Sequence, residues 1–215
     1  GEDRWQPRAL IPFQGPPEVI AFTGEEPELR AVLTDGRVQV FGTVGGQITD
    51  IVSRLRQLVV EGAEAGIPPG ASGRLRVGIQ MWFHTPAFLV DLFRQLNPEA
   101  EVVSSDPLMH PLRMVKDAGE ISLLTDAQRI AGIGMDRARE LLRPGVTAQE
   151  VATEVTYAMM RAGAEATSTP LFVNFGIETC MLHGRLSPAP LEHGELAVID
   201  LTPQVEGYCA NLART

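Results

Sequence analysis

Two long stretches in the second half of the chain carry apolar residues at the three- and four-residue spacing of an amphipathic helix. The first, residues 117–142, ends before the Arg-Pro-Gly of residues 143–145, because proline and glycine cannot extend a helix. The second, residues 147–163, opens on Thr147 and Glu150, which have the T-x-x-E spacing of a capping box. The pattern therefore predicts two consecutive helices.

The first half of the chain alternates between short strand-like and helical segments. Runs rich in Val, Ile and Phe and bounded by Pro, Gly or Asp predict strands, and amphipathic stretches between them predict helices. Strands that alternate with helices indicate a small α/β domain with a largely parallel sheet. The predicted strands are 18–23, 37–42, 75–80 and 101–104, and the predicted helices are 47–62 and 86–96.

After residue 163 the pattern changes to β. Residues 171–175, 195–201 and 205–212 are strand-like runs separated by glycine or proline. A helix pair followed by antiparallel strands is typical of the α+β class, which we expect for this part of the chain.

A domain boundary is expected near residues 106–117, where the composition shifts. Residues 106–114 are interpreted as a short connector. We therefore predict an N-terminal α/β domain at residues 1–112, incomplete at its start, and a second domain at residues 113–215.

The composition argues against some classes of function but does not identify one. The chain has 215 residues and a formal net charge of -9, and its 18 basic residues are scattered, which argues against a nucleic-acid partner. No apolar run approaches the length of a membrane span and the first residues do not resemble a secretion signal, so we expect a cytoplasmic protein with no membrane contact. Cys180 and Cys209 have no C-x-x-C spacing and are expected to be buried free thiols.

Four stretches of the second domain, taken in order, resemble the family of creatinase, prolidase (Xaa-Pro dipeptidase) and aminopeptidase P. Each is weak alone, but together they form a specific signal over about the last hundred residues. The stretches are 113–121 (RMVKDAGEI), 143–151 (RPGVTAQEV), His183-Gly184, and 198–201 (VIDL) together with 207–215 (GYCANLART). The resemblance implies a creatinase-like N-terminal domain followed by the first half of a pita-bread catalytic domain.

The resemblance also implies a metal centre. Family members carry two aspartates eleven residues apart on a hairpin, and here Asp200 stands at the first position and Asn211 at the second. If the protein is peptidase-like, the family implies two divalent ions, manganese, cobalt or zinc, whose remaining ligands lie in a second half beyond residue 215. An amide in place of a carboxylate removes one negative charge, so Asn211 is expected to weaken or abolish one of the two sites.

His183 stands where the family has an active-site histidine. An imidazole suits proton transfer because its unperturbed pKa lies near neutrality. Three functions stay open at this point. The first is hydrolysis of a C–N bond, most like that of an Xaa-Pro dipeptidase; the second is metal-independent hydrolysis of a small guanidino or amide compound by His183, without a cofactor, as in creatinase. The third is a non-catalytic binding module that keeps the fold.

The remaining expectations concern the pocket and the assembly. Phe175 and Tyr208 are predicted to bind substrate, a dipeptide or another small molecule, because they lie in strands beside the expected site. The resemblance implies a homodimer, and we expect the site to be completed by a missing C-terminal half or a second chain.

Overall fold

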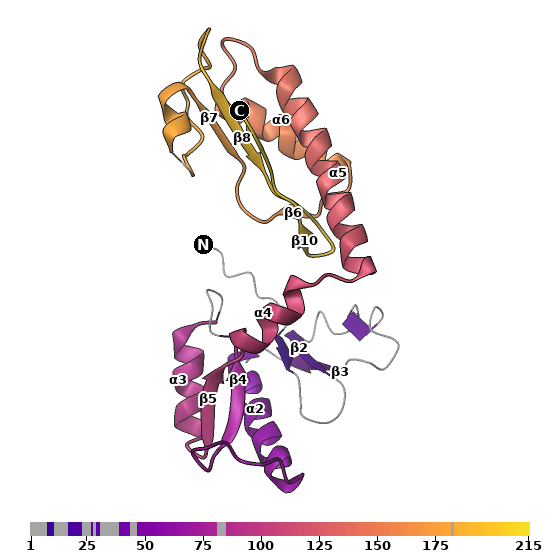
Figure 1. The fold of residues 1–215 in the computed structure, drawn as a ribbon, viewed down its shortest axis with the longest axis vertical. Coiled ribbons are helices and arrows are strands. Elements are labelled where there is room, and N and C mark those ends of the chain that lie inside the picture. The colour runs from indigo at the N-terminus through magenta and orange to yellow at the C-terminus, as the bar shows by residue number, and fades with distance from the viewer. Residues whose placement is uncertain are drawn as a thin grey trace. The chain divides into compact units, whose positions relative to one another are not determined.

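The computed structural model describes most of the chain after residue 46 and short pieces before it; the described residues are 8–10, 17–22, 27, 29–30, 39–43, 47–80, 85–181 and 183–215. The chain divides into two compact units, residues 1–114 and residues 115–215 (Figure 1).

The first unit contains two small sheets. In one, β1 (Arg8–Leu10) runs antiparallel to β2 (Glu18–Phe22), and β2 runs parallel to β3 (Gln39–Thr43). In the other, β4 (Leu75–Ile79) runs parallel to β5 (Ala100–Ser104). Both parallel pairs agree with the expected α/β alternation, although part of the predicted strand at 37–42 lies outside the described residues.

Helices connect and cover these strands. Helices α2 (Gln47–Glu64) and α3 (Ala87–Leu96) contact each other, and a small core forms around Val59, Phe93 and Ala100. An ion pair also ties α2 to the first sheet. Nε and Nη2 of Arg54 donate to the two carboxylate oxygens of Glu18 at 2.7 and 2.5 Å, and the Glu18 residue is 3% exposed.

The expected connector at 106–114 is helical, α4 (Asp106–Met114), and the sequence pattern did not predict this helix. The sequence DPLMHPLRM obscures the helix because it contains two prolines. Pro107 lies in the first turn, where the backbone N–H that proline lacks would have no partner within the helix. Only Pro111 is inside the helix.

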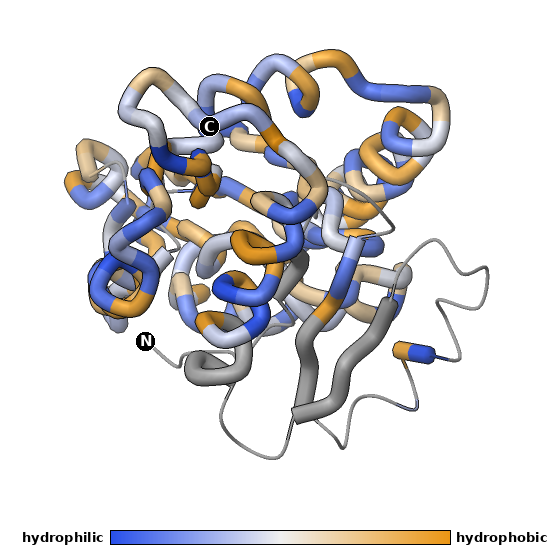
Figure 2. Tube along the Cα trace, turned by 90° about the horizontal axis from the view of Figure 1, so that it is seen from below, coloured by the Kyte–Doolittle hydropathy of each residue, from blue (hydrophilic) through white to orange (hydrophobic). Residues whose placement is uncertain are grey.

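The second unit begins with the two predicted helices, α5 (Ala118–Leu141) and α6 (Ala148–Arg161). The capping box expected at Thr147 and Glu150 is present, and Asp117 and Glu120 form another at the start of α5. The backbone N–H of Thr147 donates to the Glu150 carboxylate and is the main cause of the lowered pKa of that carboxyl group. The Thr147 hydroxyl also donates to it and is the second cause. Figure 2 shows polar and apolar residues alternating along the helical coils, as expected for helices with one buried face.

Two three-stranded sheets follow the helices. One has the order β11-β8-β7, from β7 (Phe172–Phe175), β8 (Ala197–Leu201) and β11 (Leu212–Arg214), and is antiparallel throughout. The other has the order β10-β9-β6, from β6 (Ala166–Thr167), β9 (Pro203–Val205) and β10 (Tyr208–Cys209). A 3-10 turn, η1 (Gly176–Cys180), follows β7.

The single strand expected at 205–212 is three short strands, β9, β10 and β11. Glu206 and Gly207 both have positive φ, 45° and 81°, and form the tight turn between β9 and β10. Glycine adopts this conformation without strain, which is why the chain reverses at this point.

One face of the β11-β8-β7 sheet forms the core of the second unit. Val173, Phe175, Ile199 and Leu201 are at most 5% exposed and pack with apolar residues of α5 and α6. Gly134 of α5 allows close packing, because a Cβ there would lie 2.8 Å from Met159. Among the described residues, no helix is both long and apolar enough to span a bilayer.

Candidate functional site

Asp200 and Asn211 lie side by side on the face of the β11-β8-β7 sheet opposite the core. Asp200 pairs in register with Ala213 of β11, so Asn211 is its diagonal neighbour two residues away. Nδ2 of Asn211 donates to Oδ1 of Asp200 at 2.7 Å. The hairpin therefore places an amide and a carboxylate in contact, and the pair carries one formal negative charge.

His183 lies over the same sheet face, where it contacts the aromatic ring of Phe172. Phe172 of β7 is the register partner of Asp200, so the two side chains project from the same side of the sheet. The exposed imidazole of His183 stacks on the Phe172 ring, with centroids 4.6 Å apart and an interplanar angle of 29°. The three predicted polar residues, Asp200, Asn211 and His183, are thus gathered on one sheet face.

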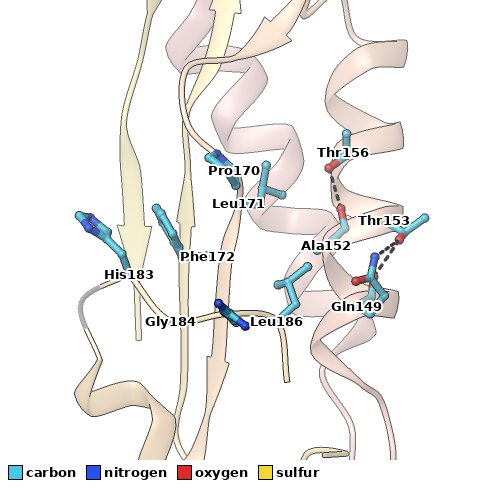
Figure 3. A pocket seen from close by; sticks show the side chains of 11 residues that line it. Gln149, Ala152, Thr153, Thr156, Pro170, Leu171, Phe172, His183, Gly184 and Leu186 are labelled. Atoms are coloured by element: carbon cyan, nitrogen blue, oxygen red, sulfur yellow. Dashed lines mark hydrogen bonds between the residues drawn. The ribbon is translucent and has the colours of Figure 1, made fainter. Parts of the chain in front are cut away.

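An open groove of about 680 Å³ borders this arrangement between α6 and the loop that carries His183 (Figure 3). Its α6 side presents an amide and hydroxyl groups, and its strand side presents apolar and aromatic groups. Arg185, on the loop, forms no ion pair with any described residue. The lining residues are Gln149, Ala152, Thr153, Thr156, Pro170, Leu171, Phe172, His183, Gly184, Arg185 and Leu186.

Phe175 and Tyr208, predicted to bind substrate, do not line the groove. Phe175 is 5% exposed and belongs to the core, because residues three apart on a strand face opposite sides and the exposed side carries Phe172. The hydroxyl of Tyr208 donates to Oε1 of Glu120 at 3.0 Å and ties β10 to the start of α5. Phe172 is the aromatic residue that contacts the candidate catalytic group.

The expectation of buried thiols is also wrong. Cys180 and Cys209 are both free and exposed. Cys180 ends the η1 turn and Cys209 lies in the two-residue strand β10, and neither position is covered by the core of this unit.

The donor atoms of the described hairpin do not by themselves make a centre of two divalent ions. Such a centre needs several carboxylate oxygens, and the hairpin supplies one carboxylate and one amide. No cluster of three or more His, Cys, Asp or Glu side chains occurs within the described ranges. These residues alone provide part of a donor set.

Comparison with known proteins indicates the protein family to which this geometry belongs. Residues 122–215 match the sequence profile of metallopeptidase family M24. This part of the chain is therefore an M24 peptidase domain, and similar proteins carry the names Xaa-Pro dipeptidase, Xaa-Pro aminopeptidase and creatinase.

Two curated relatives illustrate the range of activities named among similar proteins. A putative dipeptidase, YkvY, of Bacillus subtilis (strain 168) is 31% identical over 116 residues, 54% of this chain and 32% of the relative. A creatinase of Bacillus sp. (strain B-0618) is 32% identical over 154 residues, 67% of this chain and 36% of the relative. The chain thus spans about a third of the length of these relatives.

The fold agrees with that of solved prolidases. The recombinant prolidase of Thermococcus sibiricus superposes with a TM-score of 0.77 at 20% identity, covering 100% of this chain and 54% of that one. The likeness confirms the predicted fold class, which corresponds to the N-terminal portion of pita-bread prolidases.

Proposed function

We propose that this chain contributes to the active site of a hydrolase that cleaves a C–N bond, most like an Xaa-Pro dipeptidase. The observation that carries the proposal is the gathering of Asp200, Asn211 and His183 on one open sheet face of an M24 domain. Phe172 supplies an apolar wall beside these groups, which suits the side chain or ring of a small peptide.

In this proposal each polar group has a distinct task. A water adds to the carbon as the C–N bond breaks, and His183, exposed above the sheet, passes a proton from that water to the departing nitrogen, because an imidazole exchanges protons near neutral pH. Asp200 remains an acceptor, since Asn211 donates to only one of its oxygens and the other stays available to a substrate N–H or a water. Asn211 fixes the carboxylate by its hydrogen bond.

In this proposal the metal centre differs from that of the family, because Asn211 stands in place of the second aspartate. An amide oxygen is a neutral ligand and binds a divalent ion more weakly than a carboxylate does, so in this proposal one of the two sites is weakened or lost. We further propose that these other ligands come from a second half or a second chain, that the protein is a homodimer, and that it works in the cytoplasm. Intact-mass analysis and light scattering on the purified natural protein test the first two points.

The experiment compares hydrolysis of Xaa-Pro dipeptides with 1 mM manganese and with a chelator, in the wild type, His183→Asn and His193→Asn. His193 is the matched control, because it is also an exposed loop histidine but, unlike His183, does not stack on an aromatic ring among the described residues. We expect turnover in the wild type and in His193→Asn, and its loss in His183→Asn. Binding of the dipeptide without turnover under both conditions would refute hydrolysis and favour a binding module.

A second candidate is metal-independent hydrolysis of a small guanidino or amide compound, as in creatinase. Two observations favour it: the amide of Asn211 donates to the Asp200 carboxylate in the place where a cation would otherwise lie, and the match to the Bacillus creatinase extends over 67% of the chain. Turnover of creatine that survives the chelator and is lost in His183→Asn would establish this candidate. Strict dependence on manganese would exclude it.

A further inference from the structure

Asn174 is a buried polar residue next to the candidate site whose bonding is only half satisfied. It lies in β7, is 1% exposed, and its Nδ2 donates to the backbone carbonyl oxygen of Met181 at 3.2 Å. A carbonyl oxygen only accepts, so the amide nitrogen must face it. Oδ1 is therefore the atom left buried, and it has no partner among the described residues.

Gly184 packs directly against the same amide group. A Cβ at Gly184 would lie 2.8 Å from both Nδ2 and Oδ1 of Asn174, closer than real side chains allow. Gly184 is not among the residues with positive φ, so glycine is needed here for space and not for its backbone conformation. Asn174 thus contacts the backbone at Met181 and at Gly184, one residue after His183.

Phe172 adds a third contact to this arrangement. It precedes Asn174 by two residues on β7, so both side chains project from the same face of the sheet. Phe172 lies under the imidazole of His183, and Asn174 lies under the backbone on either side of that residue. One short strand therefore holds both the ring and the main chain of the loop.

We propose that Asn174 is a positioning residue that sets the place of the His183 imidazole on the sheet face that carries Asp200. Leucine has nearly the same shape and would remove the unpaired Oδ1, but it would also take this donor from the Met181 carbonyl, so the two effects on stability oppose each other and stability alone gives no strong preference for asparagine here. What leucine lacks is the N–H that binds the Met181 carbonyl. The catalytic consequence of this role rests on the function proposed above, but the positioning itself does not.

The test compares Asn174→Leu with Asn97→Leu as a matched control. Asn97 is also 1% exposed, donates its Nδ2 to a single backbone carbonyl, that of Phe93, and has an unpartnered Oδ1, but it lies in the first unit. Proton NMR of the full protein resolves the imidazole signals of its 4 histidines, and His183→Asn assigns those of His183. Stacking on Phe172 displaces these signals upfield.

We expect Asn174→Leu to unfold at the wild-type temperature or above, to lose the upfield displacement of the His183 signals, and to lower kcat by about 10- to 100-fold at unchanged KM. Asn97→Leu should change neither the signals nor kcat. Unchanged His183 signals in folded Asn174→Leu would overturn the proposal.

A second variant covers the case in which Asn174→Leu does not fold. At a pH at which its carboxyl is ionised, Asn174→Asp keeps the shape and replaces the N–H by an acceptor, so it should also move the His183 signals away from their wild-type positions. Wild-type signals in this variant would overturn the proposal equally. The NMR measurement does not depend on turnover. If the wild type hydrolyses nothing and the variants still move the His183 signals from their wild-type positions, the proposed function is refuted and the positioning role is supported.

Discussion

Replacing Asn211 by aspartate tests the electrostatics of the candidate site most clearly. In the wild type, Nδ2 of Asn211 donates to Oδ1 of Asp200 at 2.7 Å, whereas in Asn211→Asp two carboxylates face each other. Two unit charges about 4 Å apart repel by about 1 kcal/mol in water and about 4 kcal/mol at an effective dielectric constant of 20. Because Asn211 is exposed and Asp200 only half-buried, we expect a loss of about 1–2 kcal/mol.

The assay is thermal unfolding at pH 8 with and without manganese. For a chain of this size the loss corresponds to a fall in Tm of about 2–8 °C without metal. A divalent ion between the two carboxylates reverses it, and a recovery of about 2 kcal/mol needs manganese at roughly 30 times its Kd. The swap variant with Asp200→Asn and Asn211→Asp keeps one carboxylate and should unfold near the wild-type temperature. An Asn211→Asp protein as stable as the wild type without metal would refute this reasoning.

Three further predictions follow from other contacts. Gly184→Ala should cost about 1–3 kcal/mol in urea unfolding because its Cβ meets the Asn174 amide, and a double-mutant cycle with Asn174→Ala should recover most of that loss; additive effects would contradict the contact. Arg54→Met should cost about 2–3 kcal/mol, because it leaves the buried Glu18 carboxylate without its bidentate partner, and an unchanged denaturation midpoint would argue against this pair. The lowered pKa of Glu150 stabilises the fold above the unfolded carboxyl pKa of about 4.3 and stops doing so as pH falls through the folded value, so wild type and Glu150→Gln should differ in Tm at pH 7 and converge in acid, below the folded value.

The helices of the second unit were predictable because their ends are determined locally. Asp117 and Thr147 cap α5 and α6 with side chains close in sequence, and the apolar stripe between the caps has a helical period. Helix α4 was missed because Pro111 disguises a helix that continues through it. The strand expected at 205–212 was divided by the turn at Glu206 and Gly207, whose positive φ the apolar pattern does not report.

The candidate site was predictable where it depends on a hairpin and not where it depends on packing. The family resemblance implied a hairpin that brings Asp200 and Asn211 together, and the two side chains form a hydrogen bond. Phe175 lies in the core and Phe172 on the opposite face, and the sequence could not show this because the position of the core decides which face of β7 is buried. Asn174 left a signal in the sequence, a polar residue within an apolar strand, but its contacts with the His183 loop depend on the tertiary fold.

The most direct test of the proposed function is the release of proline from Xaa-Pro dipeptides by the wild type and by Asp200→Asn, with manganese present. The account predicts turnover in the wild type and a fall in kcat/KM of about 100-fold or more in the folded variant, because the carboxylate at the centre of the site is lost. Equal kcat/KM values for the two proteins would contradict the account, since catalysis would then not use this face of the sheet.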